Sequence, residues 1–99
     1  PYRLAFRDRA ARVVERANAL QGLAAAMPVG GMFVMLDCRG VEPDDQSLAR
    51  RLLDEARVAV VPGSGFGPGG RGHVRISLTP EMETLDQAFD RIADFIARA

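Results

Sequence analysis

Residues 58–79, VAVVPGSGFGPGGRGHVRISLT, are the segment around which the rest of this chain is organised. It predicts a strand, a glycine-rich loop and a second strand. In the second strand apolar residues alternate with polar ones, and the apolar set is Val74, Ile76 and Leu78. Because successive side chains of a strand point to opposite faces, one face belongs to a core and the other presents Arg75. A guanidinium on a rigid strand suits recognition of a carboxylate or phosphate by two parallel hydrogen bonds.

The segments around this stretch predict three helices and one more strand. Apolar residues recur every three or four positions in residues 2–20 and again from residue 82 onward, which is typical of amphipathic helices. A third helix is predicted for residues 44–56, with Asp44 or Asp45 as its N-cap. The continuous apolar run of residues 32–36 predicts a strand that is covered on both faces, as when a strand lies between helices and another domain. The last helix is expected to have Thr79 as its N-cap and Pro80 as its first residue.

The predicted order is helix, strand, helix, strand, strand, helix, in a single domain over residues 1–99. If the last strand pairs between the other two, those two run parallel to each other and antiparallel to it. The sequence therefore predicts an α+β fold, with a small mixed or antiparallel three-stranded sheet that helices cover on one face.

Composition excludes several classes of function. The chain is 47% hydrophobic and 26% charged with a formal net charge of zero, so no global attraction draws it to nucleic acid or an anionic membrane. No apolar run approaches the length of a membrane span. The single cysteine, Cys38, permits no internal disulfide and fits a reducing, cytoplasmic compartment. All thirteen lysine-plus-arginine positions are arginine, so no side chain here can form a Schiff base.

Several short motifs resemble catalytic or binding signatures but lack the context that these require. Residues 65–70 fit G-x-G-x-x-G, yet they lead into a strand and contain Pro68. Ser64 lacks the helix and the first glycine of a nucleophile elbow. No second histidine accompanies His73, and Cys38 has no histidine at an interpretable spacing, so we expect neither a metal site nor a cysteine nucleophile. Four methionines are expected to fill the core: Met27, Met32, Met35 and Met82.

Three ordered motifs resemble one known family. They are PVGGMFV at residues 28–34, VAVVPGSGFG at residues 58–67 and HVRIS at residues 73–77, and a helical pattern follows over residues 85–92. In this order and spacing they resemble the C-terminal small domain of class I/II pyridoxal-phosphate-dependent aminotransferases of fold type I. The resemblance runs over nearly the whole chain, from residue 2 to residue 96.

The resemblance implies a role for particular residues. Arg75 matches the arginine that binds the α-carboxylate of the amino-acid substrate, while Gly63, Phe66 and Gly67 would border the site. The family's cofactor-binding lysine and phosphate ligands belong to a large domain, so the resemblance implies no catalytic, cofactor-binding or metal-binding residue in this chain. Arg57 stands where the family often has glycine, so the helix end there is expected to be strained.

The resemblance also implies the partners of the whole protein. It implies amino-group transfer between an amino acid and a 2-oxo acid, with pyridoxal phosphate bound by the full-length protein and not by this chain alone. It implies a homodimer, while the composition predicts a cytoplasmic protein that binds neither nucleic acid nor membrane. The isolated chain is expected to be inactive.

Other functions stay open at this point. A stand-alone module could bind a small acid through Arg75, or the chain could serve oligomerisation alone. Related fold type I enzymes, including lyases and synthases, share the same small domain. A strand arginine can also pair with a local acidic side chain and have no further role.

Overall fold

Helices cover one face of a four-stranded antiparallel sheet. The computed structural model describes residues 2–28 and 31–98, with side chains from Ala5 onward. The strands, in their order across the sheet, are β1 (Ala24–Ala25), β2 (Phe33–Asp37), β4 (His73–Ser77) and β3 (Val61–Pro62). Val29 and Gly30, which the first family-like motif includes, lie outside the described residues.

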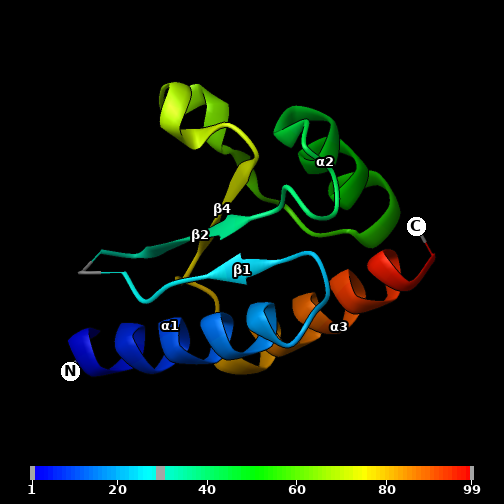
Figure 1. Cartoon of the computed structure of the whole chain (residues 1–99). Helices are drawn as coiled ribbons and strands as arrows, with labels where there is room; N and C mark the ends of the chain where they lie inside the picture. The colour runs from blue at the N-terminus through cyan, green and yellow to red at the C-terminus, as the bar shows by residue number, and fades with distance from the viewer. Residues whose placement is uncertain (1, 29–30, 99) are drawn as a thin grey trace.

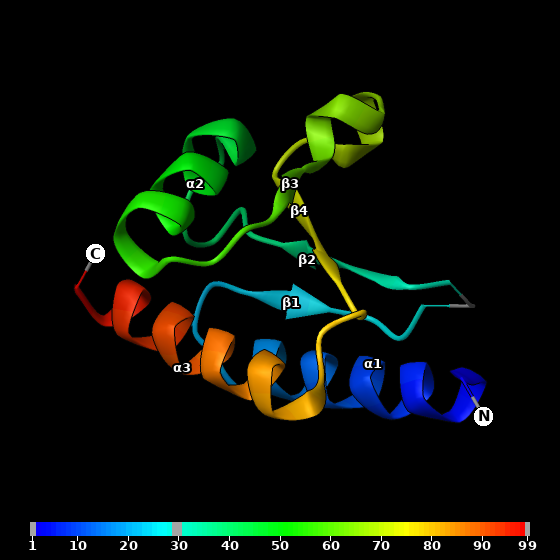
Figure 2. The same cartoon turned by 180° about the vertical axis from the view of Figure 1, so that it is seen from behind.

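The three predicted helices are present. They are α1 (Tyr2–Asn18), α2 (Asp45–Arg51), which continues as a π-helical stretch (Leu52–Ala56), and α3 (Met82–Arg98). Figures 1 and 2 show α1 and α3 side by side along one face of the sheet, with α2 near the C-terminal end of α3. Among the described residues, no helix combines the length and apolarity that crossing a membrane requires.

The sheet contains one strand more than the sequence predicts. As expected, β4 lies between β2 and β3 and is antiparallel to both. The additional strand is β1, whose Ala24 and Ala25 pair with the end of β2. Two alanines carry neither β-branched content nor an alternation that could reveal a strand, so the prediction of three strands is wrong.

Two predicted boundaries are also wrong. Of the predicted strand at residues 58–61, only Val61 pairs with β4, and Pro62, which the sequence assigns to the loop, pairs with it as well. Val58 still belongs to the helix end, because its N–H donates to the carbonyl of Leu52. The last helix begins at Met82 and not at Pro80.

The two proposed helix caps have different outcomes. The Thr79 hydroxyl lies 2.9 Å from the Ser77 hydroxyl, so its hydrogen bond is made to a side chain at the end of β4. Thr79 therefore does not cap α3. Asp44 is the N-cap of α2, and its carboxylate accepts hydrogen bonds from the backbone N–H groups of Gln46 and Ser47. Each accepted bond satisfies a donor that the helix itself leaves free.

The core lies between the helix-facing side of the sheet and the three helices. Alternate residues of β2 and β4 supply the sheet's share: Val34, Leu36, Val74 and Ile76. The helices supply residues at spacings of three and four, as their sequence patterns predict: Ala10, Val13, Ala17, Leu48, Leu52, Leu85, Phe89, Ile92 and Phe95. Arg16 of α1 joins the two long helices by ion pairs to Asp86 at 3.2 Å and Asp90 at 2.6 Å.

Arg57 ends the π-helical stretch in the left-handed conformation, with φ 59° and ψ 36°. Glycine adopts this conformation without the Cβ clash that other residues suffer. The strain that the sequence predicts at this helix end is therefore present in the backbone.

Candidate functional site

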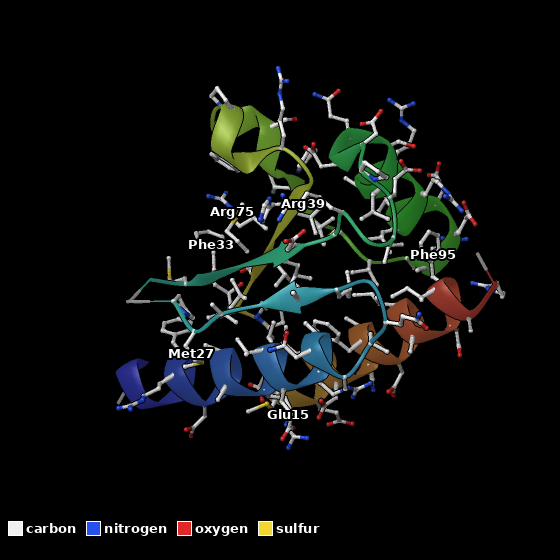
Figure 3. All side chains as sticks on the ribbon, in the orientation of Figure 1. Glu15, Met27, Phe33, Arg39, Arg75 and Phe95 are labelled. Atoms are coloured by element: carbon white, nitrogen blue, oxygen red, sulfur yellow. The ribbon has the colours of Figure 1, made fainter. Side chains whose placement is uncertain are left out.

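The face of the sheet away from α1 and α3 carries an exposed apolar patch around one arginine. We call this patch the open face and define it by Phe33 and Met35 of β2, Val61 of β3, Phe66 of the glycine-rich loop and Arg75 of β4. Its four apolar side chains are between 37% and 54% exposed. Met35 and Val61 lie directly opposite Arg75 in the two neighbouring strands. Figure 3 shows Arg75 and Phe33 on this side of the sheet.

The guanidinium of Arg75 is held by aromatic rings and not by acids. Its Cζ atom lies 3.9 Å from the ring centroid of Phe33 and 4.4 Å from that of Phe66, close enough for cation–π attraction. Its Nε atom is buried and has no hydrogen-bond partner. None of the salt bridges between described residues involves Arg75.

A half-buried cation among apolar side chains is suited to bind an acid from outside. Buried donors are nearly always satisfied in folded proteins, so a free one calls for an explanation. Loss of water around the guanidinium strengthens any ion pair that it makes, and a carboxylate can accept two of its N–H groups at once. The geometry around Arg75 therefore favours binding of a carboxylate or phosphate.

The glycine-rich loop places Phe66 over Arg75 by folding into two short 3₁₀ turns, Gly63–Phe66 and Pro68–Gly70. The two ends of the loop touch through backbone alone, because a Cβ atom on Gly63 would collide with the carbonyl of Gly70 and lie 2.8 Å from that of His73. Gly67 separates the turns with φ 116°. Three residues of the loop are expected at the border of the site. Phe66 lies against Arg75, whereas Gly63 lies at the base of the loop and Gly67 at its bend.

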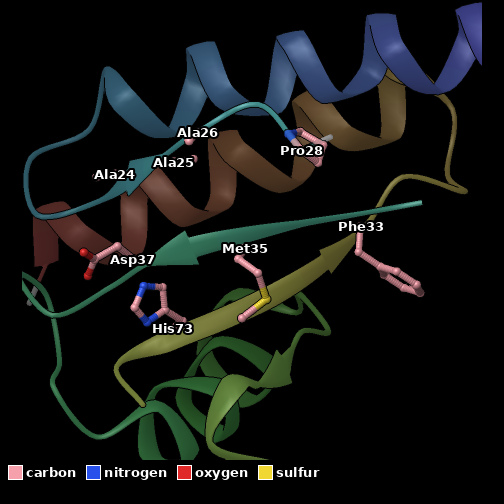
Figure 4. A pocket seen from close by; sticks show the side chains of 8 residues that line it. All are labelled: Ala24, Ala25, Ala26, Pro28, Phe33, Met35, Asp37 and His73. Carbon is pink, nitrogen blue, oxygen red and sulfur yellow. The ribbon is translucent and has the colours of Figure 1, made fainter. Parts of the chain in front are cut away.

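An open groove of about 490 Å³ lies next to the open face and shares Phe33 and Met35 with it. Figure 4 shows its lining, with Asp37 and His73 at its polar end. Hydrogen bonds from Arg39, at 3.0 and 2.7 Å, lower the pKa of Asp37 to about 2 although partial burial opposes this. The Nδ1 atom of His73 lies 2.9 Å from the carbonyl oxygen of Arg71.

Other reactive residue types lie away from this face or are already bonded. Cys38 is 1% exposed, and burial raises the pKa of its thiol to about 12, so a thiolate nucleophile does not form near neutral pH. Ser64 receives a hydrogen bond from the side chain of Gln46 at its hydroxyl oxygen. Within residues 2–28 and 31–98, no cluster of acidic, histidine and cysteine side chains could hold a metal ion.

Sequence reasoning missed Phe33 and Met35 as neighbours of Arg75. The prediction that residues 32–36 are covered on both faces does not hold within this chain, since Phe33 and Met35 are each 37% exposed. The prediction that the methionines fill the core is likewise wrong for Met27, Met32 and Met35, which are exposed. The signal that could have found Phe33 and Met35 is pairing with β4, in which Met35 faces Arg75.

Comparison with known proteins assigns the fold to a family. The model of the family described as aminotransferase class I and II matches residues 2–92. The chain belongs to this family. Its members are transferases of nitrogenous groups that use pyridoxal phosphate.

Individual relatives agree with the family assignment. The chain is 43% identical to arginine–pyruvate transaminase of Pseudomonas aeruginosa over 92% of its own length, and 42% identical to aspartate/prephenate aminotransferase of Thermus thermophilus over 98%. Alanine aminotransferase of Pyrococcus furiosus superposes with a TM-score of 0.92 at 30% identity and covers 99% of the chain. The match takes up 23% to 25% of the length of these relatives, so the chain spans about a quarter of them.

Proposed function

We propose that this chain is the C-terminal small domain of a pyridoxal-phosphate-dependent aminotransferase and that Arg75 binds the α-carboxylate of its amino-acid and 2-oxo-acid substrates. The observation that carries the proposal is the Nε–H of Arg75, which is buried and has no hydrogen-bond partner. The apolar side chains of the open face around it are exposed. An amino acid and a 2-oxo acid share this carboxylate, so one arginine serves both halves of an amino-group exchange.

The role of Arg75 in this proposal is to position the substrate. A bidentate pair fixes both the place and the plane of the carboxylate, and thereby directs the α-amino group toward the reacting partner. The rings of Phe33 and Phe66 lie against the guanidinium and limit its rotation before the substrate arrives. The glycine-rich loop, through Gly63, Phe66 and Gly67, borders the site on this view.

We assign no cofactor site to the residues of this chain. The sequence has no lysine, so covalent attachment of pyridoxal phosphate requires a residue from outside these 99 positions. We assign that lysine and the phosphate ligands to a large domain of the same protein. The isolated chain is accordingly expected to show no transaminase activity.

The open face and the groove beside it are evidence that another part of the protein covers this domain. Contiguous exposed apolar surface is rare on a protein that acts alone, and here it surrounds the proposed substrate arginine. We infer that the large domain covers part of this surface and that the whole protein is a homodimer. The buried, unpaired Cys38 agrees with a reducing, cytoplasmic compartment.

The choice of amino acid is assigned to residues outside this chain. Relatives named for arginine, aspartate and alanine match it at 43%, 42% and 30% identity over nearly its full length. A domain shared at this level by enzymes named for a basic, an acidic and a small amino acid is suited to the part that those substrates have in common, which is the α-carboxylate.

The test is Arg75→Ala in the full-length protein. Loss of one partner of a desolvated charge pair should weaken carboxylate binding by about 2 to 5 kcal/mol, which is a fall in kcat/KM of roughly 30-fold to several thousandfold. L-arginine, L-aspartate and L-alanine are the substrates to measure, and the cofactor's absorbance should be retained. Arg71→Ala, at an exposed position near the start of the same strand, is the control. Unchanged kinetics in the Arg75 variant would remove it from this role.

Two alternatives predict different results. A stand-alone acid-binding module would bind acetate or 2-oxo acids as the isolated 99-residue chain, which calorimetry can measure. A lyase or synthase that shares the small domain would also lose activity on Arg75→Ala, but it would release no 2-oxo acid coupled to amination of an acceptor. Product analysis of the full-length protein separates these reactions.

A further inference from the structure

Asp45 is a buried carboxylate that is bound by backbone N–H groups. It is the first residue of α2 and only 4% exposed, and among the described residues no other charged side chain is buried to this degree. None of the salt bridges in the described part of the chain includes it. The capping of α2 is done by Asp44, so helix capping does not explain the position of Asp45.

The two oxygens of Asp45 bind the two ends of the glycine-rich loop. Oδ2 accepts a hydrogen bond from the backbone N–H of Ser64 at 2.9 Å, and Oδ1 accepts one from the N–H of Gly72 at 3.1 Å. Burial alone would raise the pKa of Asp45, but these hydrogen bonds outweigh it and the pKa lies below its ordinary value. One ionised carboxylate thus closes the loop from beneath.

Besides these bonds, the side chain of Gln46 donates a hydrogen bond to the Ser64 hydroxyl at 3.2 Å, and the tip beyond Ser64 has few contacts. Phe66 follows Ser64 within the first 3₁₀ turn, and its ring is 54% exposed, so core packing does not fix it. A Cβ atom on Gly65, Gly67 or Gly69 would meet no atom within 4 Å, which shows that the tip is open on these sides. The position of the Phe66 ring over Arg75 therefore depends on the base of the loop.

We propose that Asp45 is a positioning residue for the carboxylate site, because it anchors the loop that holds Phe66 against the guanidinium of Arg75. This inference rests on the proposed function of Arg75. It adds that a side chain of α2, which does not contact the substrate, sets the affinity for the substrate's acid group. The chain of contacts runs from Asp45 to the backbone of Ser64, along the turn to Phe66, and from its ring to Arg75.

The test compares Asp45→Asn with Asp44→Asn in the full-length protein. Asn at position 45 keeps one acceptor but turns an N–H₂ group toward the other backbone donor, so one end of the loop is released. Asp44 accepts both of its hydrogen bonds at a single oxygen, Oδ1, and asparagine caps helices about as well as aspartate, so the control should behave like the unsubstituted protein. The two variants change the net charge equally.

Two measurements follow the proposed chain of contacts. Hydrogen–deuterium exchange of peptides covering residues 63–72 should be faster by about tenfold in Asp45→Asn, while peptides from α3 should be unchanged. The KM for the best of L-arginine, L-aspartate and L-alanine should rise between about twofold and thirtyfold, the range of a cation–π contact, and kcat should change much less. A general loss of structure would not produce this division between KM and kcat.

A double-mutant cycle tests whether Asp45 acts through the ring. Phe66→Ala should raise KM by a similar factor, and adding Asp45→Asn to it should change KM little further, because the group being positioned is already absent. If Asp45→Asn also loosens α3, Phe66→Ala alone decides, and an unchanged KM in that variant overturns the proposal.

Failure of this inference is distinguishable from failure of the proposed function. An effect of Arg75→Ala combined with unchanged exchange or unchanged KM in Asp45→Asn overturns only the role of Asp45. If Asp45→Asn raises KM by the same factor when Phe66 is already alanine, this also overturns only the role of Asp45. Unchanged kinetics in Arg75→Ala, with kcat/KM as in the unsubstituted protein, remove the proposed function and, with it, the role of Asp45 in substrate binding.

Discussion

The two faces of β2 and β4 lie in different environments although the same strands form them. On the helix side Val34, Leu36, Val74 and Ile76 are at most 4% exposed. On the open face Phe33 and Met35 are as apolar, yet more than a third of their surface is accessible. The helices of this chain are sufficient to cover one face only. This difference leaves an apolar face available for contacts outside the chain, as the proposed large domain and substrate require.

The largest expected effect is a difference in unfolding free energy between removing an aromatic ring from the core and removing one from the open face. Phe89 of α3 is fully buried, and Phe89→Ala should lower the free energy of unfolding of the 99-residue chain by about 3 to 5 kcal/mol. Phe33→Ala on the open face should cost less than about 1 kcal/mol, since its ring is already partly in water. Urea unfolding followed by circular dichroism measures both. Equal losses would mean that the open face is part of the folding core.

Gly63→Ala tests whether the base of the glycine-rich loop, beside the open face, is as closely packed as the core. A Cβ atom there collides with backbone atoms, which cannot move as a flexible side chain can. We expect a loss of about 1 to 3 kcal/mol in the free energy of unfolding. Gly65→Ala is the matched control, because its Cβ would meet nothing within 4 Å. Thermal unfolding that fails to separate the two variants would contradict the close contact between Gly63 and Gly70.

Arg57→Gly should act in the opposite direction, at the junction between the π-helical stretch and the segment that leads to β3. Relief of the left-handed strain at φ 59° should stabilise the chain by up to about 1 kcal/mol, less the larger entropy that glycine loses on folding. Arg50→Gly, at an exposed position inside α2, should destabilise it by about 0.5 to 1 kcal/mol. The two shifts in the unfolding midpoint should therefore have opposite signs.

A pH-dependent effect is expected at the polar end of the groove, where acid stability depends on one carboxylate. Hydrogen bonds from Arg39 lower the pKa of Asp37 from 3.8 to about 2, with burial opposing them. Because the folded pKa is the lower one, the ionised carboxylate stabilises the fold above pH 3.8, and this contribution is lost as the pH falls toward 2. Asp37→Asn should remove that part of the acid dependence, while Asp8→Asn, exposed on α1, should leave it. Urea midpoints at pH 5, 3 and 2 provide the comparison.

Local periodicity predicted the helices and β4 because their buried positions repeat within a short window. The alternation of Val74, Arg75 and Ile76 placed the arginine opposite the core, and the structure agrees. The same reasoning failed for β2, where an unbroken apolar run hides which residues face the helices. Pairing with β4, a contact between segments far apart in sequence, supplies the missing information.

The anchoring of the loop could not be predicted from local pattern either. The sequence left open whether Asp44 or Asp45 is the cap, since adjacent aspartates at a helix start satisfy the same rule. The structure gives them different tasks, and the partners of Asp45 lie 19 and 27 positions further along the chain. Hydrogen bonds of this range are determined by the tertiary fold.

Because the base of the glycine-rich loop is closed, the register of β4 does not depend on the length of the loop that precedes it. Backbone contact between Gly63 and Gly70, together with the bonds from Asp45 to Ser64 and Gly72, fixes where the chain leaves β3 and where it enters β4. Residues added or removed between Gly67 and Gly69, beyond Phe66, would change the size of the protruding tip and leave the ends of the loop in place. A one-residue slip within β4 would instead turn Arg75 into the core. A change of loop length at the tip would thus leave the orientation of Arg75, the proposed substrate-binding side chain, intact.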